Sequence, residues 1–163
     1  MNELTFRMAV PGDEPVILNF IHALADYEHM SNQVVATPEL LREWIFEQNK
    51  AEVLFALDEG REVGFALFFH NFSTFLGRAG IYLEDLFVLP EYRGKGYGKG
   101  LLKKLAAITA ERGCGRLEWA CLDWNKSSID FYTKRMQAVP MDEWTVYRLT
   151  GDTLKQAAED CLH

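Results

Sequence analysis

The chain has few cysteines and no excess of positive charge, and both absences narrow what it can be. Its 163 residues include only three cysteines, Cys114, Cys121 and Cys161. An odd number without metal-ligand spacing argues against a disulfide framework and against a zinc site. Lysine and arginine number 17 against 24 acidic residues, which disfavours a nucleic-acid partner. No apolar run could cross a bilayer, and the first residues show no secretory pattern. We therefore expect a soluble, cytoplasmic protein without metal, nucleic-acid or membrane partners.

The composition that remains is that of a folded domain with an uneven charge distribution. The chain is 48% hydrophobic and 13% aromatic, so we expect one domain over residues 1–163. Residues 1–85 hold 14 acidic and 5 basic side chains, whereas residues 86–136 hold 5 acidic and 10 basic ones. Any single charge is most often a solvated one. The blocks nevertheless indicate an anionic cofactor at the cationic centre and a cationic co-substrate near the acidic flanks.

Hydrophobic periodicity predicts an α+β fold. We expect helices to begin at Asp13 and Pro38, with Trp44 on the apolar side of the second helix. Strands are expected over 4–8, 51–57, 62–70, 79–89, 116–122 and 144–149, and further helices over 96–112, 125–135 and 152–159. The turn Asp58-Glu59-Gly60-Arg61 should join the second and third strands as a hairpin. An antiparallel meander is therefore followed by strands that alternate with helices.

A loop rich in glycine and cations lies between the strand that ends near Pro90 and the helix behind it. Glycines allow close approach of the backbone, and free N–H groups at a helix start attract anions. The glycine spacing does not fit Gly-x-x-x-x-Gly-Lys-Ser/Thr, and it does not fit Gly-x-Gly-x-x-Gly. What remains is Arg-x-x-Gly-x-Gly, made of Arg93, Gly96 and Gly98.

Residues 86–98 resemble the central motif of the GNAT family of N-acetyltransferases over its whole length. The resemblance implies the GNAT fold, in which a mixed, mostly antiparallel sheet flanked by helices splays beside this strand. It implies acetyl-CoA as co-substrate, with the backbone of Leu86, Phe87 and Val88 pairing with the pantetheine arm. The pyrophosphate would be held by the loop residues Arg93, Gly94, Lys95, Gly96, Tyr97, Gly98 and Lys99.

Two carboxylates interrupt the apolar run before this loop. In a regular strand Asp85 would share one face with Leu83 and Phe87, and Glu84 would lie on the other face. Burial would raise the pKa of either carboxyl and suit it to act as a base. For Asp85 a salt-bridged or capping role is the better interpretation. The segment 82–85 and the loop behind it are similar to the diamine acetyltransferase branch of the family, which implies that Glu84 lies beside the substrate amine and removes its proton through water.

A second motif runs from Trp124 to Tyr132. Asn125 is predicted to cap a helix, and Ser128 and Tyr132 lie four residues apart on one helical face. A tyrosine with a pKa of about 10 is protonated at neutral pH and can donate a proton. Asn-x-x-Ser-x-x-Phe-Tyr resembles the later GNAT motif, which implies that Asn125 and Ser128 face the cofactor and that Tyr132 is the general acid. The alternative is a core aromatic. The family's glycine in the following turn is missing from residues 133–138.

The end of the first helix also resembles the diamine branch. Tyr27 and Glu28 would hold a cationic chain by ring face and charge, unless they belong to a frayed helix end. The resemblance as a whole implies a homodimer that acetylates a primary amine of a small polycation, either a polyamine or a lysine-like amino acid. Alternatives are another amine, such as a protein N-terminus or an aminoglycoside, and an acyl-CoA sensor without turnover. The presence of both Glu84 and Tyr132 speaks against the sensor.

Overall fold

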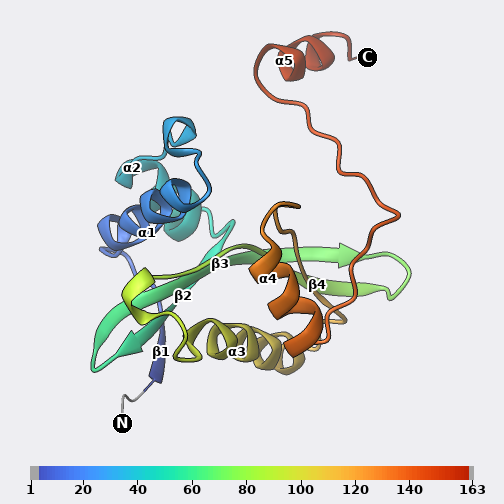
Figure 1. The fold of residues 1–163 in the computed structure, drawn as a ribbon. Coiled ribbons are helices and arrows are strands. Elements are labelled where there is room, and N and C mark those ends of the chain that lie inside the picture. The colour runs from blue at the N-terminus through green and yellow to red at the C-terminus, as the bar shows by residue number, and fades with distance from the viewer. Residues whose placement is uncertain (1–3, 162–163) are drawn as a thin grey trace. The chain divides into compact units, whose positions relative to one another are not determined.

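The computed structural model describes residues 4–161, which fall into two compact units divided between Leu122 and Asp123 (Figure 1). A single domain over residues 1–163 stays a prediction. The strands are β1 (Leu4–Met8), β2 (Glu52–Asp58), β3 (Arg61–Ser73), β4 (Arg78–Val88) and β5 (Leu117–Trp119). The helices are α1 (Glu14–Tyr27), α2 (Pro38–Leu41), α3 (Tyr97–Glu111), α4 (Lys126–Asp130) and α5 (Gly151–Glu159).

The first unit is built on a five-stranded sheet in the order β1-β2-β3-β4-β5. β1 to β4 pair antiparallel, and β5 pairs parallel to β4 after the crossover through α3. In the β2–β3 turn Glu59 and Gly60 both have positive φ, at 51° and 80°, as a tight hairpin turn requires. The predicted α+β architecture with a mixed, mostly antiparallel sheet is confirmed.

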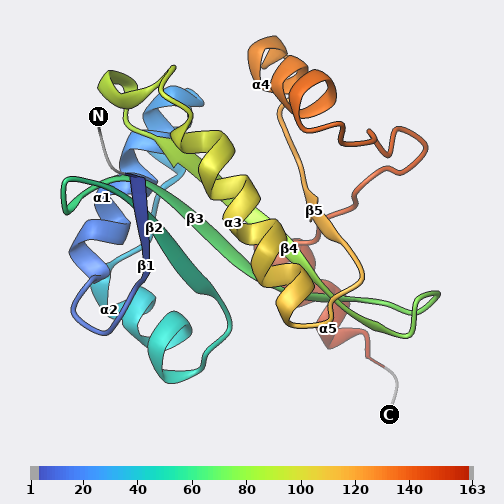
Figure 2. The same ribbon diagram turned by 90° about the horizontal axis from the view of Figure 1, so that it is seen from below.

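Helices cover both faces of this sheet, as Figures 1 and 2 show. α1 and α2 lie on one face, where Phe20 stacks on Phe65 with ring centroids 5.1 Å apart and Phe55 is fully buried. α3 lies on the other face, where Leu101 and Leu105 are fully buried. Adjacent residues of β2 and β3 therefore supply two separate apolar layers, because side chains alternate along a strand.

A β-bulge interrupts the alternation of β4 at Glu84. Asp85 lies opposite Leu67, but Leu83 lies opposite Phe68, so Glu84 has no partner residue on β3. Leu67 and Phe68 are neighbours and point to opposite faces, and the same is then true of Asp85 and Leu83. The expectation that Asp85 shares a face with Leu83 was wrong, because one extra residue shifts the register. Asp85 lies with Phe87 on the face of α1.

Both expected N-terminal helices form, but each differs from the expectation in one detail. Asp13 precedes α1 but makes no side-chain cap, because its carboxylate accepts hydrogen bonds from Arg7 and from the backbone N–H of Val10. α2 begins at Pro38 and continues as a π-helical turn, Arg42–Glu47. That turn leaves Trp44 half exposed, so Trp44 does not belong to the apolar side.

The second unit contains α4, a π-helical turn over Phe131–Arg135, and α5. The strand predicted over 144–149 does not form, and Trp144, Val146 and Tyr147 are exposed. A strand needs a neighbouring strand for its backbone groups, and the described part of this unit holds none. β5 spans only Leu117–Trp119, which is shorter than the predicted 116–122.

Candidate active site

The sheet opens along β4 beyond Leu83. β5 pairs only with Ile81, Tyr82 and Leu83, whereas β4 continues to Val88. Within residues 4–161 no strand therefore covers this edge of β4 over residues 84–88. This is the splay that the family resemblance implies, and it leaves backbone groups that can pair with an extended ligand.

The backbone of alternate residues faces this open edge. The N–H of Leu89 donates to the carbonyl of Val63 on β3 at 2.9 Å, so Leu89 and Phe87 direct their backbone groups toward β3. Leu86 and Val88 direct theirs the other way. Of the three residues expected to pair with pantetheine, Leu86 and Val88 face the edge, and Phe87 does not.

The glycine loop has the conformation that an anion site requires. Gly94 and Gly96 have φ of +77° and +88°, and the space that a Cβ would occupy at either glycine is open. Gly96 directly precedes α3, which has no side-chain cap at its start. The carbonyl of Gly96 accepts the N–H of Gly100, so the N–H groups of residues 97–99 precede the first helical hydrogen bond. These groups and the helix dipole favour an anion.

The side chains of the loop divide into exposed cations and one core aromatic. Lys95 lies 5.2 Å from the centre of the Tyr92 ring, and Lys99 is part-exposed on the first turn of α3. Tyr97 is only 3% exposed, so its side chain belongs to the core and only its backbone faces the loop. Gly98 lies 3.9 Å, measured from an ideal Cβ, from Leu86 and Val88. α3 therefore packs directly behind the open edge.

Three carboxylates gather where the edge opens, and we name Glu28, Glu84 and Asp85 the acidic cluster. Burial, the charge of Glu84 and the charge of Glu28 raise the pKa of Asp85 to about 6. Burial also raises the pKa of Glu28. Glu84 at the bulge is exposed. A carboxyl with a pKa near 6 is suited to take a proton near neutrality, so the structure adds Asp85 to the candidates for the base.

Tyr27 and Phe87 form an aromatic corner beside the acidic cluster. Their ring centroids are 6.2 Å apart, with an angle of 59° between the planes. The guanidinium of Arg93 lies over both rings, 4.6 Å from the centre of Tyr27 and 4.9 Å from that of Phe87. Its Nε donates to the carbonyl of Val88 at 3.0 Å. Sequence reasoning missed this arrangement, because no local pattern joins the end of α1 to the glycine loop.

The second unit holds the remaining expected residues. The Asn125 side chain accepts the N–H of Ser128 at 3.4 Å, which confirms the predicted helix cap. Tyr132 lies in the π-helical turn, part-buried, with its ring edge-on to Phe131 at 5.6 Å. The turn that lacks the family's glycine places Gln137 at φ +57°. A π-helical turn adds a residue, so the left-handed position falls on Gln137.

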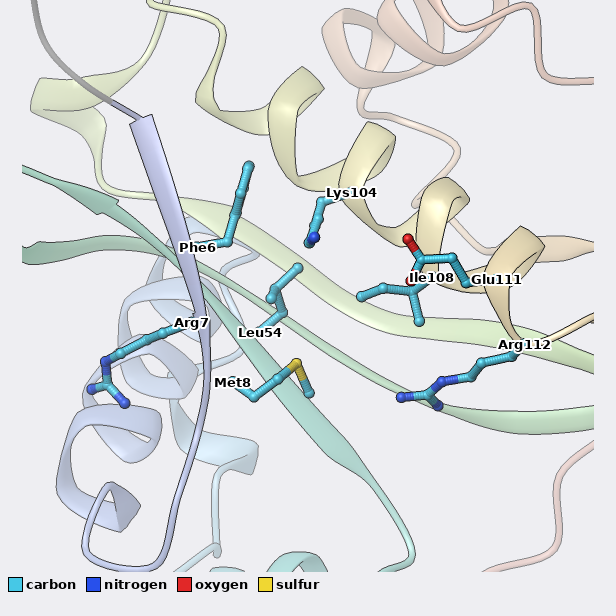
Figure 3. Close-up of a pocket in the computed structure, with 8 residues that line it drawn as sticks. All are labelled: Phe6, Arg7, Met8, Leu54, Lys104, Ile108, Glu111 and Arg112. Carbon is cyan, nitrogen blue, oxygen red and sulfur yellow. The ribbon is translucent and has the colours of Figure 1, made fainter.

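A cavity of about 340 Å³ lies elsewhere in the first unit, between β1, β2 and α3 (Figure 3). Its lining includes Arg7 and Arg112, which are held in ion pairs with Asp13 and Glu52, and Lys104. It contains no residue of the acidic cluster or the glycine loop. Among the helices of residues 4–161, none combines the length and the apolar composition that a membrane span requires.

Comparison with known proteins agrees with this geometry. Residues 19–136 match the acetyltransferase (GNAT) family. The chain is 38% identical to a thialysine N-epsilon-acetyltransferase of Sus scrofa over 97% of this chain and 99% of that protein. It is 33% identical to an L-ornithine N5-acetyltransferase of Arabidopsis thaliana over 91% of this chain and 85% of that protein. An integron cassette protein of V. cholerae has the same fold, with a TM-score of 0.80 and 26% identity. The match covers 96% of this chain and 98% of that one. The chain therefore belongs to the GNAT family and is an acetyl-CoA-dependent N-acetyltransferase.

Proposed function

We propose that the protein acetylates the side-chain amine of a small basic amino acid of the lysine, thialysine or ornithine kind. The observation that carries this proposal is the acidic cluster at the open edge of β4, because three carboxylates attract a cationic amine. The relatives that act on thialysine and ornithine support it. A polyamine is the second candidate acceptor, favoured by the same cluster.

Acetyl-CoA fits the open edge and the glycine loop. Leu86 and Val88 would pair with the pantetheine arm, and the N–H groups of residues 97–99 would hold the pyrophosphate. Arg93, Lys95 and Lys99 would add positive charge. The family resemblance also assigns Asn125 and Ser128, at the cap of α4, to the binding of the cofactor. When bound, acetyl-CoA supplies the activated acetyl thioester.

The chain's own residues would then move protons from the amine and to the thiolate, and would stabilise the negative charge that develops on the thioester oxygen. The acceptor amine loses a proton, through water, to Glu84 or Asp85. Its nitrogen forms the new bond to the acetyl carbon as the carbon–sulfur bond breaks. The N–H of Val88 faces the open edge and would stabilise the charge that develops on the thioester oxygen. Tyr132 would donate its phenolic proton to the departing thiolate. The proton that the nitrogen releases as the amide forms would return to the tyrosinate through water, so the reaction balances.

The test is thiol release from acetyl-CoA with a panel of amines at equal concentration. We expect thialysine, lysine and ornithine to react faster than spermidine, an aminoglycoside or a peptide N-terminus. Glu28→Gln should raise KM for the cationic amines, whereas Glu59→Gln in the exposed β2–β3 turn should not. Preference for a polyamine would replace the proposed acceptor. Tight CoA binding without release from any amine would indicate a sensor instead.

We further propose a cytoplasmic homodimer. The odd number of cysteines supports a reducing compartment. Val139, Met141, Trp144, Val146 and Tyr147 are exposed in the single chain, and exposed apolar side chains in such number are typical of an interface. Sedimentation velocity at micromolar concentration should show a species of twice the chain mass of 18.7 kDa. A purely monomeric profile would contradict the dimer.

A further inference from the structure

Arg93 occupies the ring face that the acceptor amine would use. Its guanidinium lies 4.6 Å from the centre of Tyr27, and Tyr27 was assigned to the acceptor. Arg93 was assigned to the pyrophosphate of the cofactor. As long as the guanidinium lies over Tyr27, that ring face is closed to a second cation. Arg93 and the acceptor amine therefore compete for the ring face of Tyr27.

We propose that Arg93 is a placeholder cation that leaves the aromatic corner when CoA binds and so opens the corner to the acceptor amine. The inference rests on the proposed function, because it takes Tyr27 as part of the acceptor site. It deepens that function by coupling the two binding events through one residue. CoA should bind first or should strengthen the binding of the amine, and the amine should strengthen the binding of CoA by the same factor.

The contacts of Arg93 are of the kind that a phosphate can displace. Two ring faces and one carbonyl hold it, and in residues 4–161 no carboxylate forms an ion pair with it. It is an exposed side chain. Hydrogen bonds from arginine to phosphate are charge-assisted and about twice as strong as neutral ones. A diphosphate next to the loop would therefore outcompete the rings.

Movement of Arg93 would also prepare the edge of β4. Its Nε holds the carbonyl of Val88, and that carbonyl faces the open edge. Departure of the guanidinium frees this acceptor for the amide groups of the pantetheine arm. The same displacement thus completes the cofactor site and vacates the ring of Tyr27 for a second cation, to which aromatic faces are attractive.

Calorimetric titration of thialysine into the whole protein tests the coupling, with CoA in place of acetyl-CoA so that no turnover occurs. For the wild type we expect thialysine to bind about fivefold or more tightly when CoA is saturating. Arg93→Gln should bind thialysine without CoA about as tightly as the wild type does with it, so its coupling factor should be close to one. Lys99→Gln is the matched control, because it removes a loop cation that lies over no aromatic ring within residues 4–161. It should keep the coupling factor.

Coupling that persists in Arg93→Gln, or that is absent from the wild type, overturns the placeholder. Failure of thialysine and of every other amine to bind at saturating CoA would instead overturn the proposed acceptor. A measurement without any amine then decides the placeholder. In the NMR spectrum of the folded wild type, the side-chain protons of Arg93 should be shifted upfield by the two rings and should lose this shift when CoA is added. An Arg93 signal that keeps its shift with CoA bound contradicts the proposal.

Discussion

Asp85 on β4 lies close enough to Glu28, the C-terminal cap of α1, for the charge of Glu28 to act on its carboxyl group. Burial, the charge of Glu84 and the charge of Glu28, in this order, raise the pKa of Asp85 to about 6. The bulge at Glu84 is the cause of the arrangement, because it turns Asp85 to the face of α1. The protein thus holds a carboxyl group at a pKa useful to a base, at a cost in stability.

The first prediction concerns that cost. The unfolded carboxyl has a pKa of about 3.9, so the native state disfavours the charged form of Asp85. The stabilising contribution of the raised pKa is fully present below about pH 4 and is lost as the pH rises through about 6. Asp85→Asn should therefore be more stable than the wild type by about 1–2 kcal/mol at pH 8, a value reduced for solvent screening. Urea unfolding at pH 8 and pH 4 should show the difference shrinking to near zero at pH 4. Asp123→Asn, an exposed control, should show no such pattern.

The second prediction concerns the pH dependence of catalysis. If Asp85 takes the amine proton, kcat/KM of the wild type should fall below about pH 6. Glu28→Gln removes one negative charge that raises this pKa, so the acid limb should move to lower pH. Glu59→Gln should leave it in place. An acid limb that is unchanged in both Glu28→Gln and Asp85→Asn would exclude Asp85 as the base and leave Glu84.

The third prediction concerns Tyr132. Tyr132→Phe removes only the hydroxyl, so loss of the general acid should lower kcat by about a hundredfold or more. Tyr147→Phe, in the exposed segment before α5, is the control and should retain the wild-type rate. The rates are compared by thiol release with saturating acetyl-CoA. A Tyr132→Phe enzyme at full rate would remove this residue from the mechanism.

The fourth prediction concerns the ion pairs of Arg7. It donates to Asp13 at 2.8 Å and to Glu62 at 2.7 Å, and lies 4.8 Å from the centre of the Phe55 ring. Arg7→Met should lower the free energy of unfolding by about 2 kcal/mol near pH 7. The loss is limited to this size because the ion pairs are partly exposed. The hydrogen bonds from Arg7 lower the pKa of both carboxyls. Their contribution is present above about pH 4 and is lost as the pH falls through the folded values.

Denaturant unfolding of Arg7→Met at pH 7 and pH 3 tests this sign. The difference in the free energy of unfolding between Arg7→Met and the wild type should be smaller at pH 3 than at pH 7. Arg148→Met, in the exposed segment before α5, should leave the free energy of unfolding nearly unchanged at both pH values. A gap that widens in acid would contradict the assignment of the stability to these ion pairs.

The fifth prediction concerns Gln137. A left-handed φ of +57° costs a residue with a side chain about 1 kcal/mol relative to glycine. Gln137→Gly should therefore raise the free energy of unfolding by up to about 1 kcal/mol. Lys134→Gly, inside the π-helical turn, should lower it by a similar amount. Thermal unfolding of both variants tests whether Gln137→Gly is stabilised and Lys134→Gly is destabilised. A destabilised Gln137→Gly would show that this backbone carries no strain.

Local patterns predicted the elements whose conformation depends on neighbours in the sequence. The Glu59-Gly60 turn, the helix expected over 96–112, which is α3, and the Asn125 cap all form as expected. The bulge at Glu84 could not be predicted, because it depends on which residue of β3 lies opposite. The strand over 144–149 failed for the same reason, since a suitable pattern forms no strand without a neighbour to pair with.

The sequence by itself determined the family and predicted residues 93–99 as the site of the cofactor's pyrophosphate, because the glycine spacing and the helix start are properties of one continuous segment. Only the tertiary structure decided that the pKa of Asp85 is raised to about 6 and that Arg93 shares an aromatic corner with Tyr27. A pKa depends on burial and on charges close in space, and a ring contact depends on two segments meeting. Both are therefore set by how α1 packs on β4, which no local pattern records.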